Sequence, residues 1–446
     1  MTALATGKAF AVPFRDFNRW SVKSFFSIQW NWPVSMIQPL SRALERKKIV
    51  INRKHGIHSD LVLLSLHFDG EMEPRNADAE NFKGNLFLAE TGDVLYSKID
   101  VRNGAIGVVP VSIPRVAVSS EFPVYKIRPD VALPQYVKLL FRTNAFLRQI
   151  NSLISGASGR KRVQPSDLEQ IEAPLPDPSV QQRIVDFWQE AQSAVDTAHD
   201  RLYEPVRSLN NRLSEIYRNT STRDVIHSRC FVVDFKDLMA WDAKSGRAAS
   251  FRLACPSFLP LGDFIEDKTD LIHPAAEPDK SWPVYGVNNK DGVFLNSHQK
   301  GSTFNAPYKR IRKDWFFHNP TRCNVGSLGI VPDVPEDAIT SPEYQVWRLK
   351  EDIPQPLVPG YVACLIQTPF FLELVQFNRV GAVKQRMYTE NLMQVRIPHI
   401  PLPEQQNYAN ARKKALTELS EAKSRLIKTR EEVEAMILGV KKVEAL

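Results

Sequence analysis

The chain repeats the same ordered set of residues at a nearly constant spacing of about half of its 446 residues. Arg162–Leu168, then Pro174 and Gln181-Gln182, returns as Arg386–Leu392, then Pro398 and Gln405-Gln406. The period is far longer than the ~20–50 residues of a solenoid unit. The sequence therefore predicts two copies of a whole domain, each followed by a connector.

Further matches at the same spacing run along most of the chain. They are Asp16, Trp20, Lys23 and Ser24 with Asp237, Trp241, Lys244 and Ser245; Pro39-Leu40 with Pro260-Leu261; Asp69-Gly70 with Asp291-Gly292; Gly104, Gly107 and Pro110 with Gly326, Gly329 and Pro332; and Tyr136, Val137, Leu140, Thr143 and Phe146 with Tyr361, Val362, Leu365, Thr368 and Phe371. A chance match would not recur in this order.

The composition is that of a soluble globular protein, with 43% hydrophobic and 24% charged residues. No apolar run approaches the ~18 residues of a membrane span, and no secretory signal is visible at the N-terminus. The four cysteines form no Cys-x-x-Cys pair, so we expect reduced thiols and a cytoplasmic protein. A net charge of +8 is compatible with a polyanionic partner but does not require one.

Two segments combine helical periodicity with very little glycine, and each follows a proline-rich stretch that suits a helix start. Pro205 lies within the first segment and predicts a kink or a split. Alternating spacings of three and four indicate a seam for a partner helix. The seam residues are Ile184, Trp188, Ala191, Val195, Ala198, Leu202, Val206, Leu209, Leu213 and Ile216 in the first segment, and Tyr408, Ala415, Leu419, Ala422, Leu426, Val433, Met436 and Val440 in the second.

The remaining sequence alternates short strand-like runs with helix-like runs that begin near proline, which predicts an α+β fold. We expect two pseudo-symmetric mixed domains, at 1–175 and 221–400, separated by spacer helices at 176–220 and 401–446. A two-fold relation between the copies would make these helices antiparallel, and they would then form a coiled-coil spacer. The alternative is that each helix packs only on its own domain.

No catalytic or metal-binding pattern is complete. Asn319-Pro320-Thr321 resembles the Asn-Pro-Pro-aromatic signature of amino-methyltransferases, but it lacks the second proline and the aromatic residue. There is no P-loop and no His-Glu-x-x-His pair. We therefore predict no catalytic residue, no bound cofactor and no metal site.

Basic residues set among glycine and asparagine stand out at equivalent places in both halves, and such groups contact phosphates and base edges. A solvated turn would look the same. The DNA-binding candidates are Lys98, Arg102, Asn103, Arg160, Lys161 and Arg162 in the first half, and Asn288, Asn289, Lys309, Arg310, Arg312, Arg322, Asn324, Lys384 and Arg386 in the second.

The two halves also differ in charge at equivalent places. Arg46, Lys47 and Lys48 lie where the second copy has Glu266 and Asp267. The basic cluster Lys309–Lys313 has no basic counterpart in the first copy. Two domains that read different sequences must differ where they read, although surface drift gives the same pattern.

With these features the sequence resembles the specificity subunits of Type I restriction-modification systems. The resemblance rests on Tyr96–Gly107, Val284–Lys290, Asn319–Arg322 with Gly326–Gly329, and the two proline-rich segments that end in Gln-Gln before a long helix. It implies two target recognition domains, each reading one half of a bipartite, asymmetric target in double-stranded DNA. It also implies a subunit without catalytic activity. The partners would be two modification subunits, which bind S-adenosylmethionine and methylate adenine, together with restriction subunits where these are present.

Two departures from that family concern the docking surface. The first proline-rich segment lacks the Glu usually found before the last Gln, and Pro205 interrupts the first helix. Two other classes remain open from the sequence. The chain could be a stand-alone DNA methyltransferase or nuclease with an unrecognised site, or a coiled-coil adaptor without a role on DNA.

Overall fold

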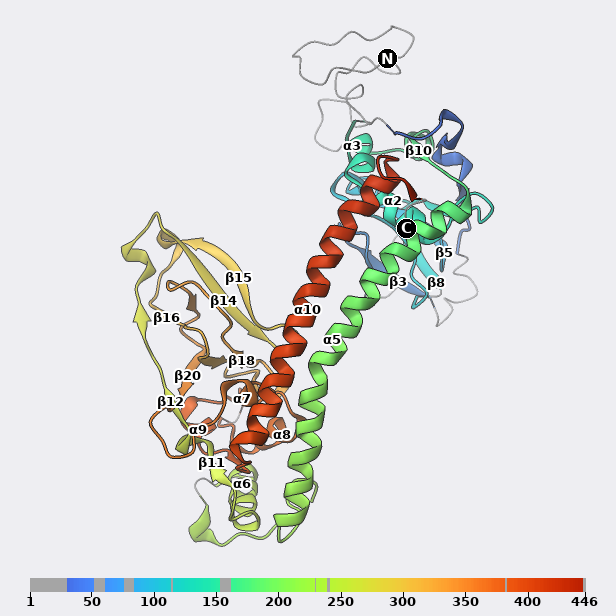
Figure 1. The fold of residues 1–446 in the computed structure, drawn as a ribbon. Coiled ribbons are helices and arrows are strands. Elements are labelled where there is room, and N and C mark those ends of the chain that lie inside the picture. Colours follow the sequence, from blue (N-terminus) through green and yellow to red (C-terminus); the bar gives the residue numbers. More distant parts are fainter. Residues whose placement is uncertain are drawn as a thin grey trace. The chain divides into compact units, whose positions relative to one another are not determined.

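The computed structural model describes residues 30–51, 61–75, 84–113, 115–152, 162–228, 230–238, 241–381 and 383–443. The chain divides into two compact units (Figure 1). Unit 1 comprises Met1–Val195 and Ala422–Leu446, and unit 2 comprises Asp196–Glu421. The predicted boundaries at 175, 220 and 400 stay a prediction.

Within its described residues, unit 1 contains two four-stranded sheets and one short strand pair. The first sheet has the order β2(Leu44–Lys47)-β9(Val124–Ile127)-β6(Val94–Tyr96)-β7(Ile106–Val108), and all its pairs are antiparallel. The second has the order β4(Met72–Arg75)-β3(Val62–Leu66)-β8(Arg115–Ser119)-β5(Leu86–Glu90), with β3 and β8 parallel. The pair is β1(Ile37–Pro39) with β10(Glu172–Pro174), and the helices are α2(Pro134–Phe141), α3(Asn144–Ser152) and α4(Pro165–Glu169).

Unit 2 repeats the strand order of both sheets and adds one edge strand, β13. One sheet has the order β12(Ile265–Asp267)-β20(Gln345–Leu349)-β17(Phe316–His318)-β18(Leu328–Ile330). The other has the order β13(Leu271–Ile272)-β16(Tyr308–Arg310)-β19(Ile339–Thr340)-β14(Ser281–Asn288)-β15(Gly292–Lys300), with β14 and β19 parallel. The short pair is β11(Leu259–Pro260) with β21(Arg396–Ile397), and the helices are α6(Ala243–Ala254), α7(Pro359–Leu365), α8(Pro369–Asn378) and α9(Thr389–Met393).

The predicted α+β class and the internal duplication are therefore confirmed. The additional edge strand of the five-stranded sheet, β13, corresponds in unit 1 to a single bridge between Val50 and Phe87. The β13 pairing uses the equivalent positions, because Leu271 and Ile272 face Lys309 and Tyr308.

Each unit has its own core, built around large side chains at equivalent positions. Tyr136 and Phe146 are fully buried in unit 1, and their repeats Tyr361 and Phe371 are fully buried in unit 2. Burying one such side chain contributes roughly 1.5–3 kcal/mol. The repeat therefore kept these aromatic residues because each core has to be filled independently.

A buried glutamine joins each long helix to the α+β part of its unit. Gln181 is fully buried; its Oε1 accepts the Leu133 N–H at 2.9 Å, and its Nε2 donates to the carbonyls of Val131 and Pro176 at 2.8 and 2.7 Å. In unit 2 the Gln405 Oε1 accepts the Val358 N–H at 3.0 Å, and Nε2 donates to the Ile400 carbonyl at 2.9 Å.

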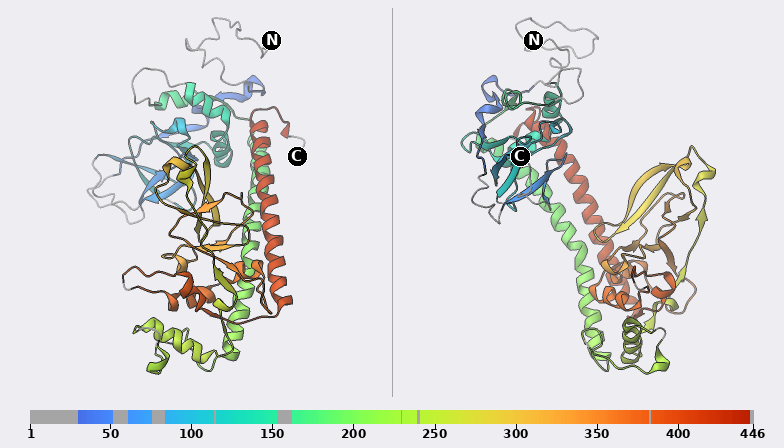
Figure 2. Two further views of the ribbon diagram at one scale, coloured as in Figure 1. Left: turned by 90° about the vertical axis from the view of Figure 1, so that its left-hand side faces the viewer. Right: turned by 180° about the vertical axis from the view of Figure 1, so that it is seen from behind.

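The two long helices are α5(Pro178–Thr220) and α10(Leu402–Ile437). Figure 2 shows α5 as one uninterrupted helix, so a split at Pro205 is excluded, and the alternative of a kink there stays a prediction. Proline removes one backbone donor, but the other backbone hydrogen bonds of the helix are kept, and the helix continues past Pro205.

Within each unit the helices pack against each other. In unit 2 they run antiparallel, because Arg201 pairs with Glu418 at 3.2 Å and Arg212, further along α5, pairs with Glu404 at 3.0 Å. In unit 1 Arg425 pairs with Glu190 at 2.8 Å, but this contact is exposed and contributes little stability. The alternative that each helix packs only on its own domain is therefore excluded.

Burial along the predicted seam is uneven. Some of the predicted positions lie in the cores and others are only partly covered. Ile184, Leu209, Leu213, Leu419 and Val433 are buried, whereas Trp188, Val195, Leu202 and Leu426 are partly exposed. The helices are thus anchored most strongly where each meets an α+β core.

The last turn of α10 also contacts the first described residues of the chain. The Asn31 N–H donates to the Leu438 carbonyl at 2.8 Å, and the Trp32 Nε1–H donates to the Ile437 carbonyl at 2.8 Å. Near the same end of α10, the Asn144 N–H at the start of α3 donates to Glu434 at 2.7 Å. Sequence regions from opposite ends of the chain therefore share one unit. Met1 and Leu446, which we expect to lie close together, are outside the described residues.

The four cysteines are free thiols; Cys230 is exposed, and Cys255, Cys323 and Cys364 are buried. Within the described ranges no single helix is long and apolar enough to cross a membrane, and only the bent pair α7 and α8 together reaches that length and composition.

Candidate nucleic-acid interface

The two glycine-containing loops predicted to contact DNA occupy equivalent places, each between two strands of the antiparallel sheet. In unit 1, β6 leads into the short helix η5(Val101–Asn103), and Gly104 follows with φ 101°. In unit 2, β17 leads to η10(Cys323–Val325), and Gly326 follows with φ 86°. Both glycines have the left-handed conformation that other residues rarely adopt.

A β-hairpin turn lies close to each loop and leaves little room for a side chain at the loop glycine. A Cβ at Gly104 would collide with the Phe68 carbonyl, and a Cβ at Gly326 would lie 3.3 Å from the Asn289 Cβ. The turns are the repeated Asp69-Gly70 and Asp291-Gly292 at the tips of the β3–β4 and β14–β15 hairpins. The repeated glycines and the repeated turn thus form one structural unit.

In unit 1 the loop presents Arg102 and Asn103 on its exposed side. Lys98 is partly buried, and its Nζ donates to the Ser120 carbonyl at 2.6 Å. Arg162 lies beside Lys98, because the Val163 N–H donates to the Lys98 carbonyl, and its guanidinium pairs with Glu121 at 3.2 Å. Arg160 and Lys161 lie outside the described residues.

In unit 2 the structure brings more of the predicted residues together. Arg322 is exposed on the loop, Asn324 is partly exposed, and Asn289 reaches the loop from the hairpin turn. Asn288 serves the turn itself. Its Oδ1 accepts the N–H groups of Lys290 and Asp291 at 2.8 and 2.6 Å.

A second basic loop of unit 2 lies directly beside the first. Backbone bonds between Val380 and Arg386 close this loop, and Lys384 is exposed on it. The Arg379 guanidinium joins the two loops, donating to the carbonyls of Thr321 and Gln385 at 3.2 and 2.7 Å. Burial lowers the pKa of Arg379 from its ordinary value.

Lys309 and Arg310 lie on β16 of the other sheet and Arg312 follows that strand; all three contact other groups of the protein. Lys309 is only 8% exposed, and its Nζ donates to the Tyr344 carbonyl at 2.7 Å, while burial lowers its pKa. Arg310 lies 3.9 Å from Asp270, and Arg312 stacks over the Trp315 ring. The buried Lys309 ammonium is poorly placed to meet a phosphate.

The charge differences on β2 and β12 have a structural explanation. Arg46 pairs with Glu169, and Lys47 pairs with Glu90 and Asp93 at 2.6 and 2.8 Å. In unit 2, Glu266 on β12 instead pairs with Arg348 on β20. The charged residues of β2 and β12 thus form different ion pairs within their own units. The charge difference between these two strands is explained by those pairs and does not require a contact with DNA.

Two residues that position the loops were missed by the sequence reasoning. Arg142 donates to the carbonyls of Phe68 and Ile106, joining the hairpin turn to β7, and burial lowers its pKa. At the equivalent position of unit 2, Gln367 binds the start of β18, donating to the Leu328 carbonyl at 2.6 Å. The available signal was a polar residue in both copies immediately before the repeated Thr143 and Thr368.

A buried polar side chain supports the candidate loops from below in each unit. The Tyr96 hydroxyl donates to the Val163 carbonyl at 3.3 Å. At the equivalent position, the His318 Nε2 bonds the Met387 carbonyl at 2.9 Å, and its Nδ1 accepts from Trp347 Nε1 at 3.3 Å. The ring is therefore neutral with its proton on Nε2, and burial lowers the pKa of His318 to about 4.

The arrangement suits binding of a polyanion better than catalysis. Exposed Arg, Lys and Asn side chains lie on adjacent loops that a rigid sheet supports. No group of three or more metal-ligating side chains occurs within the described part of the chain.

Comparison with known proteins gives matches among solved structures only. No protein-family model matches the sequence, and no curated protein matches it. One similar chain comes from a structure described as the basis of complex assembly and conformational transition of the type I R-M system; the identity is 13% and the TM-score 0.38, over 91% of this chain and 95% of that one.

Two further solved structures are similar over comparable lengths. The HsdS subunit from Thermoanaerobacter tengcongensis is 14% identical with a TM-score of 0.29, over 91% of this chain and 94% of that one. The Type-I restriction-modification system S subunit from M. genitalium is 10% identical with a TM-score of 0.39, over 89% and 94%.

Proposed function

We propose that this chain is the specificity subunit of a Type I restriction-modification complex and reads a bipartite target in double-stranded DNA. The observation that carries the proposal is the duplication: one chain builds the same α+β unit twice, and each unit presents a basic, asparagine-containing loop at the same place. Two such units of different sequence suit two half-sites of different sequence.

The chemistry of the loops is consistent with this role. Arg and Lys supply salt-dependent contacts to phosphates, and Arg and Asn also form hydrogen bonds with base edges in the major groove. In unit 2 the candidates are Asn289, Arg322, Asn324, Lys384 and Arg386; in unit 1 they are Lys98, Arg102, Asn103 and Arg162. Buried Lys309 and turn-forming Asn288 are the weakest members of the predicted set.

The subunit itself would perform no chemistry. Modification of adenine N6 requires that the base leave the stack, and this step belongs to a methyltransferase partner that binds S-adenosylmethionine. We propose two such modification subunits per chain, because the chain offers two equivalent units, and restriction subunits where the system includes them. The specificity subunit then fixes which adenine the partner reaches, in the cytoplasm where its DNA is found.

The decisive experiment is sequencing of modified bases in DNA from cells that express the chain together with its modification partner. We expect methyladenine within two defined sequence blocks that flank an unspecified spacer. A single continuous motif would contradict two independently reading units.

Two controls separate the other classes of function. The purified chain, given S-adenosylmethionine and DNA without a partner, should transfer no methyl group and cut no strand; activity in this assay would make it an enzyme. A coiled-coil adaptor, in contrast, would show no sequence dependence in a DNA-binding titration.

A further inference from the structure

The Arg379 side chain joins the two exposed basic loops of unit 2. One nitrogen of its guanidinium, Nη2, donates to the carbonyls of Thr321 and Gln385 at 3.2 and 2.7 Å. Thr321 directly precedes Arg322, and Gln385 directly follows Lys384. The two hydrogen bonds therefore fix the backbone immediately beside the exposed cation of each loop.

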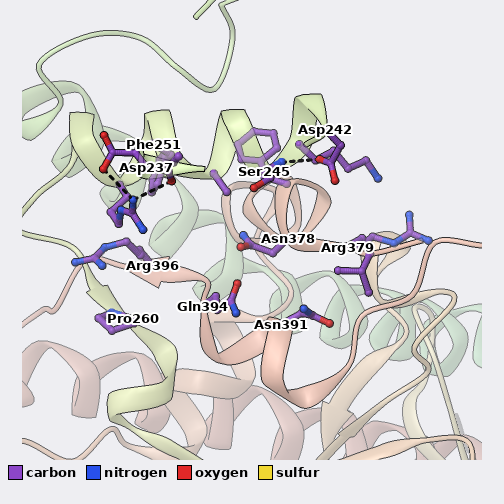
Figure 3. Close-up of a pocket in the computed structure, with 16 residues that line it drawn as sticks. Asp237, Asp242, Ser245, Phe251, Pro260, Asn378, Arg379, Asn391, Gln394 and Arg396 are labelled. Carbon is purple, nitrogen blue, oxygen red and sulfur yellow. Dashed lines mark hydrogen bonds and ion pairs between the residues drawn. The ribbon is translucent and has the colours of Figure 1, made fainter. Parts of the chain in front are cut away.

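A packed helix holds the base of this side chain. Helix α8 ends at Asn378, immediately before Arg379, and packs against η10 of the first loop. Phe377, one residue earlier, is buried in the core of unit 2. Figure 3 shows the Arg379 side chain extending away from Asn378 and Gln394, which line the neighbouring cavity. A functional group carried by a rigid helix end is held in place better than one carried by a loop.

Other hydrogen bonds hold the two loops together at their base. The Met387 N–H donates to the Pro320 carbonyl at 2.8 Å, and the His318 Nε2 donates to the Met387 carbonyl at 2.9 Å. These bonds lie where the chain leaves β17 and where the loop of Lys384 ends. They do not involve Arg379. Replacement of Arg379 would therefore leave the loops attached and release only their exposed ends.

The spacing of the two exposed cations matters for one kind of DNA contact and not for another. The attraction of Arg and Lys to phosphates is independent of sequence and needs no fixed placement. Phosphate contacts held at a fixed spacing also set the register in which other side chains meet the bases. Asn324 on the first loop and Asn289 on the adjoining hairpin turn are such side chains. A fixed spacing of Arg322 and Lys384 therefore supports discrimination between sequences.

The Arg379 guanidinium is less accessible than the cations that it positions. Its Nη2 already donates to two carbonyls, and its Nε is buried. Arg322 and Lys384, in contrast, are exposed. Arg379 is therefore suited to act through these two residues.

This arginine belongs to the second half of the chain. The Gly-Ala pair at 156–157 returns at 381–382, and counting back from it places Ile154 where the second half has Arg379. Ile154 itself lies outside the described residues. An isoleucine side chain has no donor for a carbonyl, so a replacement of Arg379 should affect one half of the target and not the other.

We propose that Arg379 is a positioning residue for target recognition: it holds Arg322 and Lys384 at a fixed spacing, and this spacing sets how strictly unit 2 reads its block of the target. Arg379 itself contacts no base. The inference rests on the proposed function, since the target is the DNA named there.

The test is a DNA-binding titration of the full-length chain in complex with its modification partner. Three duplexes are compared: the target found by sequencing of modified bases, and two duplexes in which one or the other block is changed. Arg379→Met should reduce the discrimination against one changed block at least about fivefold and leave the other as in the wild type. The slope of log affinity against log salt should stay the same, because no phosphate contact is lost.

A positioning role also predicts a specific coupling. In a chain that carries Arg322→Ala and Lys384→Ala, no pair of cations remains to be held in place. Adding Arg379→Met to this chain should change the discrimination no further. A full additional loss would show that Arg379 acts on the DNA by itself and would overturn the proposal.

Arg247→Met is the matched control. Arg247 is another arginine of unit 2 that donates to two backbone carbonyls, those of Ile226 and Ser228 at 3.4 and 3.0 Å. It joins α6 to the segment after α5 and not the two basic loops. Its replacement should leave the discrimination against both changed blocks as in the wild type. An equal loss in this control would assign the effect to general destabilisation of unit 2.

A second variant guards against misfolding. Thr321 is exposed and Gln385 is partly exposed, so water can replace the guanidinium at their carbonyls and unit 2 should stay folded. Arg379→Gln keeps a polar side chain that is two bonds shorter, and it should lose discrimination as Arg379→Met does. Circular dichroism of both variants should match the wild type.

The remaining outcomes separate the two hypotheses. A wild-type complex that binds all three duplexes alike refutes the proposed function, on which this inference rests. A wild-type complex that discriminates while Arg379→Met discriminates equally well refutes this inference alone. A decrease of the salt slope by about 1 in Arg379→Met would make Arg379 a phosphate contact, and unfolding of both Arg379 variants would make it a general structural residue. Either result overturns the proposal.

Discussion

The buried glutamines at the start of the long helices allow a sharp test of how each helix is joined to its unit. Gln181→Ala removes the partners of one N–H and two carbonyl groups, those of Leu133, Val131 and Pro176. A buried backbone group left without a partner costs about 1–3 kcal/mol. Three such groups give an expected loss of about 3–9 kcal/mol in unit 1.

Gln405→Ala should cost less, about 2–6 kcal/mol, because it leaves only the Val358 N–H and the Ile400 carbonyl without partners. The neighbouring glutamines are natural controls. Gln182 and Gln406 donate to Asp186 and Asn410 one turn along the helix surface, so their replacement by Ala should cost only about 0.2–0.5 kcal/mol.

Hydrogen exchange read by mass spectrometry is the appropriate assay, because it reports each unit separately and a chain of two units need not unfold in one step. Peptides that contain Leu133 should lose protection in Gln181→Ala, and peptides that contain Val358 should lose it in Gln405→Ala. Equal protection, within about 0.5 kcal/mol, in Gln181→Ala and Gln182→Ala would refute the reasoning.

Three further predictions concern the candidate site and the chain path. Arg322→Ala should reduce the slope of log affinity against log salt by about 1 for any DNA sequence, whereas Lys309→Met should leave the slope unchanged; a titration at several salt concentrations distinguishes them. Burial lowers the pKa of His318 from the ordinary 6.5 to about 4, so stability is full above pH 6.5 and falls by about 3 kcal/mol as the pH drops to 4; denaturation at both pH values should show this loss, and His318→Gln should show less of it. Joining the ends and reopening the chain near Thr220 should give a folded protein by circular dichroism, since the Asn31 N–H already meets the end of α10; an unfolded product would argue against this chain path.

Much of the fold could be predicted because the duplication places the same structural residues at equivalent positions in both halves. Glycines, prolines and core aromatics recur where a backbone conformation or a packing volume leaves few choices, as at Gly104 with Gly326 and Tyr136 with Tyr361. The helical seams were visible for the same reason. The predicted split at Pro205 did not occur, because the loss of one backbone hydrogen bond is small beside the remaining bonds of a 43-residue helix.

The candidate site was harder to predict than the fold. A lysine in a basic cluster looks the same in sequence whether its ammonium faces water or, as at Lys309, donates to a carbonyl inside the protein. Asn288 and Asn289 are adjacent in sequence, yet one forms a turn and the other faces the loop at Gly326. Such differences depend on contacts between residues far apart in the chain.

The sequence by itself determined the internal duplication, the α+β class, and the two long helices with their proline-rich starts. Periodicity and steric constraints act between residues close in sequence, and here they occur in both copies. Only the tertiary structure decided which charges are free to meet a partner. It placed Arg322 beside the loop of Lys384, engaged Arg46, Lys47 and Lys309 within their units, and left the repeated Trp241 exposed. Burial and ion pairing are set by neighbours distant in sequence, and no local pattern encodes them.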